Sequence, residues 1–241
     1  MRPQIYIGTS GWNYKHWEGI FYPKKYPKSK WLEFYASHYT TVELNASFYR
    51  LPTPKTFKGW RERTPDTFLW AVKGNRYITH IKRLKSVEEP LQRFFNAIEH
   101  LGAKLGPILF QIPPNLSFDE ETLDLFCKGL KKNLLYSIEI RHPSWAQKSA
   151  IEILKDNNIA LCISDSAGRY PYIEKNTASF FYIRLHGSKK LYSSEYSEEE
   201  LQAYARKITG WKKDTYIYFD NDYGGYAINN SKRLREILGL S

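Results

Sequence analysis

Apolar residues recur along the chain in short runs that are separated by longer amphipathic stretches. Eight runs have the length and the branched and aromatic content of buried strands: residues 5–8, 41–45, 68–73, 108–111, 137–141, 160–165, 180–186 and 215–220. Between them, residues 30–38 and 90–101 carry apolar side chains at helical spacing. One strand and its connection take about 30 residues, which is the size of a strand plus a crossover helix.

Two pairs of residues mark expected helix starts. Ser117 with Glu120, and Ser197 with Glu200, have the spacing of a capping box, in which a hydroxyl and a carboxylate satisfy the first free N–H groups. Residues 166–179, in contrast, contain glycine and proline and show no helical period. We therefore expect an irregular crossover after the sixth strand.

The alternation of strands and helices predicts an α/β protein, a single (β/α)8 barrel of the TIM type over residues 1–241. No Ser/Gly-rich linker, low-complexity segment or shift in composition marks a domain boundary. An open doubly wound sheet is the alternative, and it favours a GxGxxG phosphate loop after the first strand. Residues 8–12 read GTSGW and lack that spacing, which favours the barrel.

Composition places the chain among ordinary globular proteins. Of its 241 residues, 42% are hydrophobic and 25% are charged, which excludes a long disordered chain. No apolar run approaches the ~20 residues of a membrane span, and the first residues lack the regions of a signal peptide. Cys127 and Cys162 form neither a disulfide framework nor a CxxC motif. We therefore expect a cytoplasmic protein with no membrane partner.

The chain is basic, since 36 Lys and Arg residues against 25 Asp and Glu residues give a net charge of +11. The basic residues are spread over predicted helices and loops, which is typical of a solvated outer surface. If they converge on one face, they form a nucleic-acid surface instead. The sequence leaves both possibilities open.

Polar residues end or follow every predicted strand. In a parallel barrel, the strand ends and the loops after them surround the active site. An ionised group there is unfavourable unless it is paired or functional, so a ring of such groups predicts a site. The candidates are Ser10, Glu43, Asn45, Lys73, Gln111, Glu139, Arg141, His142, Asp165, Arg184, His186, Asn221 and Asp222.

Chemistry divides these candidates into catalytic and substrate-binding residues. The catalytic candidates are His186, Glu139 and Asp165, and histidine is the strongest of them because it titrates near neutral pH. Arg141 and Arg184 could clamp an oxyanion through paired N–H donors, and Lys73 could add a point charge. The other polar candidates complete the substrate-binding set. Three loop aromatics join it, because they could line a pocket and stack on a sugar or a base: Trp12, Tyr14 and Tyr49.

No cofactor is strongly implied by the sequence. A divalent metal could take ligands from separate strands, namely Glu43, Glu139, Asp165, His186 and Asp222. Lys73, Arg141 and Arg184 would repel the ion, and the chain has no HxH or HExxH spacing. We therefore expect no metal site.

Several short motifs are together highly specific. They include residues 8–12 (GTSGW), 42–45 (VELN), 139–145 (EIRHPSW), 184–187 (RLHG) and 219–222 (FDND), and with others they span nearly the whole chain. In these motifs the chain resembles the YecE-like family, also called domain of unknown function 72. The resemblance implies a TIM-barrel-like fold and carries no catalytic assignment. Ser47 stands where the family usually has threonine, and Asn230 where it usually has alanine.

Two hypotheses of function follow. The first is an enzyme or ligand binder whose Arg-, Lys- and His-rich pocket takes an anionic small molecule, of the phosphate or sugar phosphate class. The second is a nucleic-acid-binding barrel, or a metal-dependent nucleic-acid-processing one, which uses the basic surface and the loop aromatics. Binding of this second kind falls steeply with salt. The pattern favours an enzyme over a pure binder and does not assign a reaction class.

Overall fold

Parallel strands alternate with helices through residues 3–240, the part of the chain that this computed structural model describes. The strands are β1 (Ile5–Thr9), β2 (Thr41–Leu44), β3 (Leu69–Lys73), β4 (Leu105–Gln111), β5 (Tyr136–Glu139), β6 (Ala160–Leu161), β7 (Ile163–Asp165), β8 (Phe180–Leu185) and β9 (Asp214–Phe219). They form two parallel sheets, in the orders β1-β9-β8-β7 and β2-β3-β4-β5-β6. The predicted α/β class with parallel strands is therefore confirmed.

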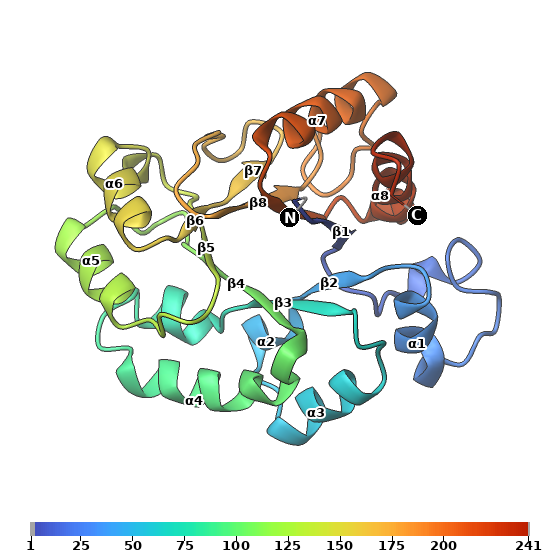
Figure 1. The fold of residues 1–241 in the computed structure, drawn as a ribbon, viewed down its shortest axis with the longest axis horizontal. Helices are drawn as coiled ribbons and strands as arrows, with labels where there is room; N and C mark the ends of the chain where they lie inside the picture. The colour runs from blue at the N-terminus through green and yellow to red at the C-terminus, as the bar shows by residue number, and fades with distance from the viewer. Residues whose placement is uncertain (1–2, 241) are drawn as a thin grey trace.

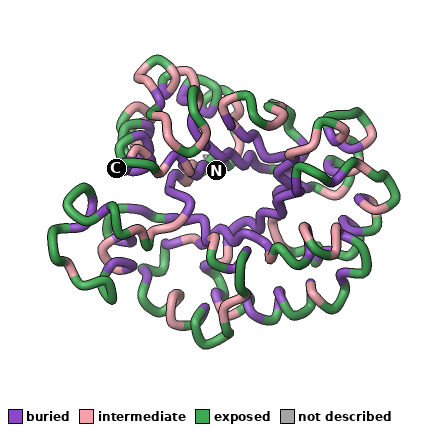
Figure 2. The backbone as a smooth tube through the Cα atoms, turned by 180° about the vertical axis from the view of Figure 1, so that it is seen from behind, coloured by how far each residue is buried: buried purple, intermediate pink, exposed green. Residues whose placement is uncertain are grey.

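The helices lie on the outside of the strands, which are arranged around a common centre (Figure 1). They are α1 (Trp31–Ala36), α2 (Ala46–Tyr49), α3 (Pro54–Glu62), α4 (Glu88–Ile98), α5 (Glu120–Lys128), α6 (Lys148–Asp156), α7 (Glu198–Trp211) and α8 (Tyr226–Ile237). Seen from behind, the buried backbone forms the inner ring and the exposed backbone the periphery (Figure 2). Within residues 3–240, no helix is both long and apolar enough to cross a membrane.

Two seams separate the sheets. The predicted sixth strand is split at Cys162 into β6 and β7, which belong to different sheets. At the other seam, no backbone ladder joins β1 and β2 in the described residues. The Tyr35 hydroxyl bridges them instead, because it accepts from Thr9 N at 3.1 Å and donates to Thr41 O at 3.1 Å. The strand pairing therefore shows two separate hydrogen-bonded sheets. It does not show one continuous eight-stranded barrel sheet.

The approach of β1 to β2 explains a glycine in the first strand. A Cβ atom on Gly8 would lie only 2.4 Å from the carbonyl oxygen of Thr41. Backbone cannot yield at such a distance without moving a strand, so a side chain at residue 8 would force the two strands apart.

Helix starts agree with the sequence at one site and differ at another. Ser197 and Glu200 form the predicted capping box at α7. At α5 the cap is Asp119, whose Oδ1 accepts from Thr122 N at 2.8 Å, so the predicted box of Ser117 with Glu120 is wrong. The helix begins at Glu120, which leaves no place for that residue at the third helical position. The crossover at residues 166–179 contains no helix, as predicted.

Strand alternation decides which side chains point to the centre. In β8, Ile183 and Leu185 pack with residues of α7 such as Leu201 in one apolar cluster. Tyr182 and Arg184 alternate with them and therefore point the opposite way, into the ring. Each buried aliphatic side chain contributes about 1.5–3 kcal/mol of stability, which holds the strand in this register. The packing of the outer face thus fixes the inward direction of the polar residues.

Candidate functional site

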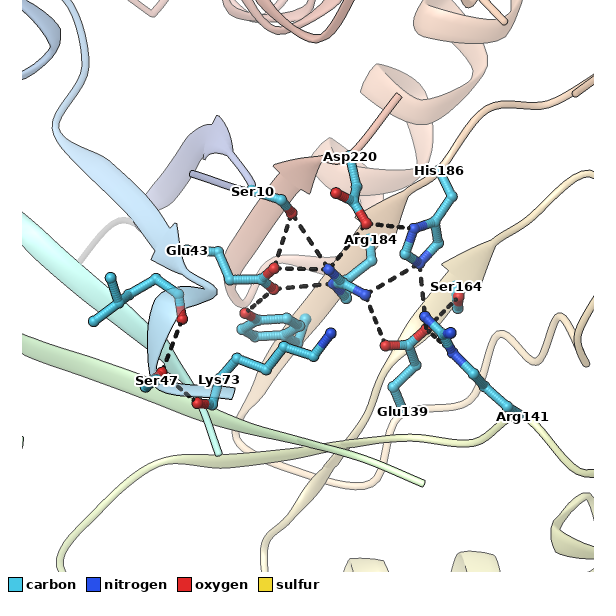
Figure 3. Close-up of polar contacts among 12 residues, drawn as sticks. Ser10, Glu43, Ser47, Lys73, Glu139, Arg141, Ser164, Arg184, His186 and Asp220 are labelled. Atoms are coloured by element: carbon cyan, nitrogen blue, oxygen red, sulfur yellow. Dashed lines mark hydrogen bonds and ion pairs between the residues drawn. The ribbon is translucent and has the colours of Figure 1, made fainter. Parts of the chain in front are cut away.

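Arg184 is the centre of a buried network of ionised side chains (Figure 3). Its Nε and Nη2 atoms donate to the two carboxylate oxygens of Glu43, at 3.0 and 2.8 Å. Its Nη1 donates to Glu139 Oε2 at 2.8 Å, and Nη2 also lies 3.1 Å from Asp220 Oδ2. One guanidinium group therefore joins three carboxylates that come from β2, β5 and the end of β9.

His186 is a second bridge between two of these carboxylates. Its Nδ1 lies 2.8 Å from Asp220 Oδ2, and its Nε2 lies 3.2 Å from Glu139 Oε1. Both ring nitrogens thus face a carboxylate oxygen, and each can donate when it carries a proton. We call Glu43, Glu139, Arg184, His186 and Asp220 the ion-pair network.

Hydroxyl groups complete the hydrogen bonding of the network. Ser10 Oγ donates to Glu43 Oε1 at 2.8 Å, and Tyr182 donates to Glu43 Oε2 at 2.7 Å. Ser164 Oγ donates to Glu139 Oε1 at 3.3 Å. Buried carboxylates are tolerated when their oxygens are satisfied in this way. The buried carboxylates of the network therefore have hydrogen-bond donors on the inner face of the ring.

Charge keeps the buried carboxyl groups ionised. Burial opposes the ionisation of Glu139, but the guanidinium groups of Arg141 and Arg184 outweigh it and hold its pKa well below its ordinary value. Asp220 follows the same pattern, with burial opposed by Arg184 and a lowered pKa. Burial disfavours the charge of Arg184, yet Glu43 and Glu139 raise its pKa well above the ordinary value. The partners stabilise one another, so removal of one leaves an uncompensated buried charge.

Arg141 stands beside the network and closer to solvent. Its Nε and Nη2 atoms lie 3.1 and 3.0 Å from Glu139 Oε1. Its guanidinium carbon lies 4.6 Å from the centre of the Tyr170 ring, which supports the group from one face. Among residues 3–240, no acceptor contacts its Nη1 atom. That N–H group is therefore available to a ligand.

Lys73 is the second available cation and ends β3. Its Nζ lies 4.4 Å from the centre of the Phe48 ring, and the described part of the chain offers it neither a hydrogen bond nor an ion pair. Figure 3 shows its side chain extending toward the network. Burial, together with the charge of Arg184, lowers the pKa of Lys73 to about 8. We call Lys73 and Arg141 the mouth.

His80 lies next to the mouth, and the positive charge of the mouth affects its pKa. Its ring packs edge-on against Phe48, with the centres 5.0 Å apart. Burial, and next the charges of Lys73, Arg76 and Arg141, lower the pKa of His80 to about 4. The imidazole is therefore neutral at pH 7, and positive charge converges on this side of the ring.

The structure brings most of the predicted polar residues to this end of the strands. Glu43, Glu139, Arg184 and His186 are in the network, with Ser10 bonded to it. Lys73 and Arg141 form the mouth, and Asn45 and Gln111 follow or end strands β2 and β4. Tyr14 lies beside the network, where its hydroxyl donates to the carbonyl oxygen of Ser10.

Other predicted residues lie elsewhere. Asp165 accepts from the Tyr204 hydroxyl at 3.0 Å, on the outer face and away from the network. Asn221 holds a loop through Ser194 O and Asn230 Oδ1, and His142 caps the turn at Ser144.

Asp222 accepts from Trp17 Nε1 at 2.6 Å, and burial raises its pKa to about 6. Trp12 packs edge-on against both Trp60 and Trp70, and Tyr49 is exposed at a separate groove.

Several residues at the site were not among the candidates. Asp220 belongs to the network and Tyr182 bonds directly to it, and Tyr182 could have been found because it shares a strand face with Arg184. Ser164 could have been preferred to Asp165 only by knowing which face of β7 points inward. Tyr170 and Tyr192 contact Arg141 and His186 from irregular loops, where sequence period gives no signal.

The strand-end carboxylates are not arranged as a set of metal ligands. In residues 3–240, no three His, Cys, Asp or Glu side chains form a group that could hold a metal ion. The network carboxylates are directed at Arg184, which occupies the position between them. The donor set does not fit a resident divalent cation.

Fold and site together define a parallel α/β protein whose strand ends enclose a network of buried ionised side chains. Residues 6–241 match the family described as "Protein of unknown function DUF72", so the chain belongs to this family.

Individual relatives agree with that assignment. The chain is 27% identical to the UPF0759 protein YunF of Bacillus subtilis, over 98% of this chain and 95% of that protein. It is 30% identical to the UPF0759 protein YecE of Escherichia coli, over 61% of this chain and 52% of that protein. A DUF72 family protein of Thermotoga maritima has a similar structure, with a TM-score of 0.87, 28% identity and coverage of 98% and 99%. A DUF72 family protein of Enterococcus faecalis, at 22% identity and a TM-score of 0.85 over 99% and 96%, shows the same fold.

Proposed function

We propose that the two sheets work as one barrel of the TIM type, which presents a single ring of strand ends. Contacts across both seams support this arrangement. At the split in the predicted sixth strand, Ser164 Oγ of β7 donates to Glu139 Oε1 of β5, in the other sheet, at 3.3 Å. The Tyr35 hydroxyl joins β1 to β2 at the other seam. Active sites on this architecture lie at the carboxyl ends of the strands, where the network is.

The mouth of this ring, in our proposal, binds an anionic, phosphorylated small molecule. The observation that carries the proposal is the pair of unsatisfied cationic donors, Lys73 Nζ and Arg141 Nη1. The negative charge of Glu139 is shared among Arg184, Arg141 and His186, so it is neutralised inside the network. Lys73 has no carboxylate within ion-pair distance among the described residues. A bound anion would supply that missing partner.

The buried residues take a supporting role in this proposal. Glu139 and His186 are fully buried, and the Tyr192 ring packs edge-on against His186 at 5.4 Å. They cannot touch a ligand in this conformation, so we regard them as positioning residues that hold Arg141. Lys73 is the group at the mouth that exchanges a proton near neutral pH. If the protein is an enzyme, Lys73 is the acid–base candidate that a ligand can reach.

Calorimetric titration with sulfate at pH 7 and pH 9, at constant ionic strength, tests the proposal. Sulfate resembles a phosphoryl group and keeps its charge across this range. With the pKa of Lys73 at about 8, the ammonium form is lost as pH rises. We expect affinity to fall by about tenfold from pH 7 to pH 9, in proportion to the protonated fraction.

Lys73→Arg is the matched control for this titration. Arginine stays charged at both pH values, so the variant is expected to bind sulfate with little dependence on pH. Arg141→Met is expected to lose binding at both. Sulfate binding that is absent, or equally pH-dependent in Lys73→Arg, would contradict the proposal.

A further inference from the structure

A surface groove of about 430 Å³ is lined by residues that belong neither to the mouth nor to the ion-pair network. The loops after β2 and β3 form one side of it and helix α4 the other. Its chemically distinctive lining residues are Tyr49, Arg50, Arg76, Tyr77, Arg93 and Phe94. We call it the tyrosine groove.

Two tyrosine rings of the groove are open to solvent. Tyr49 is 73% exposed and Tyr77 is 47% exposed, although a large aromatic side chain normally gains stability from burial. Both positions are held firmly. The Tyr49 ring rests edge-on against Phe48 at 5.0 Å, and Tyr77 N donates to Asn75 Oδ1 at 2.9 Å. Both rings are therefore open to a planar partner at the surface.

The π-helical turn Tyr77–Ile81 strengthens this interpretation. Within it, Tyr77 and Ile81 are both exposed while Ile78 and Thr79 are buried. Helical turns with this wider hydrogen-bond spacing are rare and frequently lie at functional sites. The turn directs two large side chains outward at the groove.

Positive charge in the groove is not compensated. The residues that line it include three arginines and no Asp or Glu. In the described part of the chain, no hydrogen bond or ion pair joins the guanidinium group of Arg50 or of Arg76 to another residue. Arg93 lies 3.6 Å from Glu89, but both side chains are largely exposed, and such pairs contribute little. The groove thus combines flat apolar faces with free guanidinium groups.

We propose that the tyrosine groove binds single-stranded nucleic acid. Unpaired bases would stack on Tyr49 and Tyr77, because every base offers a π-face to an aromatic ring. Phosphates would contact Arg50, Arg76 and Arg93, whose planar donors match phosphate oxygens. A duplex keeps its bases stacked inside and cannot use the tyrosines in this way. The net charge of +11 favours such a polyanion over a neutral partner.

Fluorescence anisotropy with a labelled 12-nucleotide oligo(dT) and a labelled duplex of the same length tests this proposal. We expect the single strand to bind more tightly than the duplex. Three phosphate contacts predict that the logarithm of the affinity falls with the logarithm of the salt concentration, with a slope of about −2. Tyr49→Ala and Tyr77→Ala are each expected to weaken single-strand binding by about tenfold. Arg50→Gln is expected to weaken it and make the salt slope shallower by about 0.7.

Tyr223→Ala is the matched control, because Tyr223 is also 73% exposed but lies outside the groove. It is expected to leave single-strand binding unchanged. Three results would each overturn the proposal: no binding of oligo(dT), an equal loss in Tyr223→Ala and Tyr49→Ala, or binding of a mononucleotide without binding of the oligonucleotide. Sulfate binding at the mouth is expected to be the same in Tyr49→Ala and wild type, which separates the two sites.

Discussion

Replacing Arg184 by methionine is expected to lower the free energy of unfolding by about 3–5 kcal/mol at pH 7, because it breaks a buried ion pair on one side. Glu43 and Glu139 would stay buried without the guanidinium that contacts both. Urea unfolding followed by circular dichroism measures this loss. If the variant does not fold, Arg184→Lys, which keeps the charge but cannot contact both carboxylates in parallel, is expected to fold with an intermediate loss.

Arg63→Met is the matched control for Arg184→Met. Arg63 also holds a carboxylate through two bonds, from Nε and Nη2 to Glu33 at 2.9 and 2.8 Å, but its side chain is 40% exposed. Water screens this pair, so its loss is expected to cost less than about 1 kcal/mol. Equal losses in the two variants would contradict the view that burial makes the network sensitive.

The effect of Arg184→Met depends on pH with a definite sign. Glu139 and Asp220 have lowered pKa values in the folded protein, so they stabilise it above their unfolded pKa values and lose this effect as pH falls. In the variant these carboxyl groups lose their cation, so their pKa values rise. The difference in stability between wild type and variant is therefore expected to be smaller at pH 4 than at pH 7.

Replacing Lys73 by methionine is expected to have the opposite effect on stability, a gain of about 1–3 kcal/mol at pH 7. Burial lowers the pKa of Lys73 from 10.5 to about 8, which means that the folded protein disfavours the ammonium ion. This penalty is present below about pH 8 and disappears as pH rises toward the unfolded value. The gain in Lys73→Met is thus expected to shrink between pH 8 and pH 10. Thermal and urea unfolding at several pH values measure it.

Lys104→Met is the control, because Lys104 and Lys73 are both 8% exposed. Lys104 Nζ donates to Arg61 O at 2.8 Å and Thr64 O at 2.7 Å, and it lies 3.4 Å from Asp66 Oδ1. Its removal leaves buried carbonyl groups unsatisfied and is expected to cost about 1–3 kcal/mol. Sulfate binding is expected to vanish in Lys73→Met and to persist in Lys104→Met. A loss of stability in both variants would mean that Lys73 is a structural residue.

Much of the inner face could be predicted from the sequence. The position of a residue along its strand and the alternation of side chains are enough to indicate which residues meet there. Glu43, Glu139, Arg184 and His186 come from distant parts of the sequence, yet parallel strands bring their ends to one side. The same logic fails at β7, because alternation separates Ser164 from Asp165 without saying which of them points inward. Only the packing of β7 against its neighbours settles that direction.

Other features have no pattern that reveals them. The seam between β1 and β2 depends on a hydroxyl of Tyr35, a side chain of helix α1. Tyr170 and Tyr192 reach the site from loops without a period. The sequence also presents Lys73, Arg141 and Arg184 alike as candidates for contact with an anion. Their difference lies in distances: the carboxylates satisfy Arg184 fully and Arg141 in part, and leave Lys73 without a partner.

The most direct test of the account is a crystal structure of the protein soaked in tungstate, an electron-dense analogue of sulfate, at a concentration that saturates the calorimetric titration. The account predicts one anomalous peak at the mouth, with tungstate oxygens at hydrogen-bond distance, about 2.7–3.2 Å, from both Lys73 Nζ and Arg141 Nη1. An empty mouth, with tungstate bound only to exposed lysines elsewhere, would contradict it.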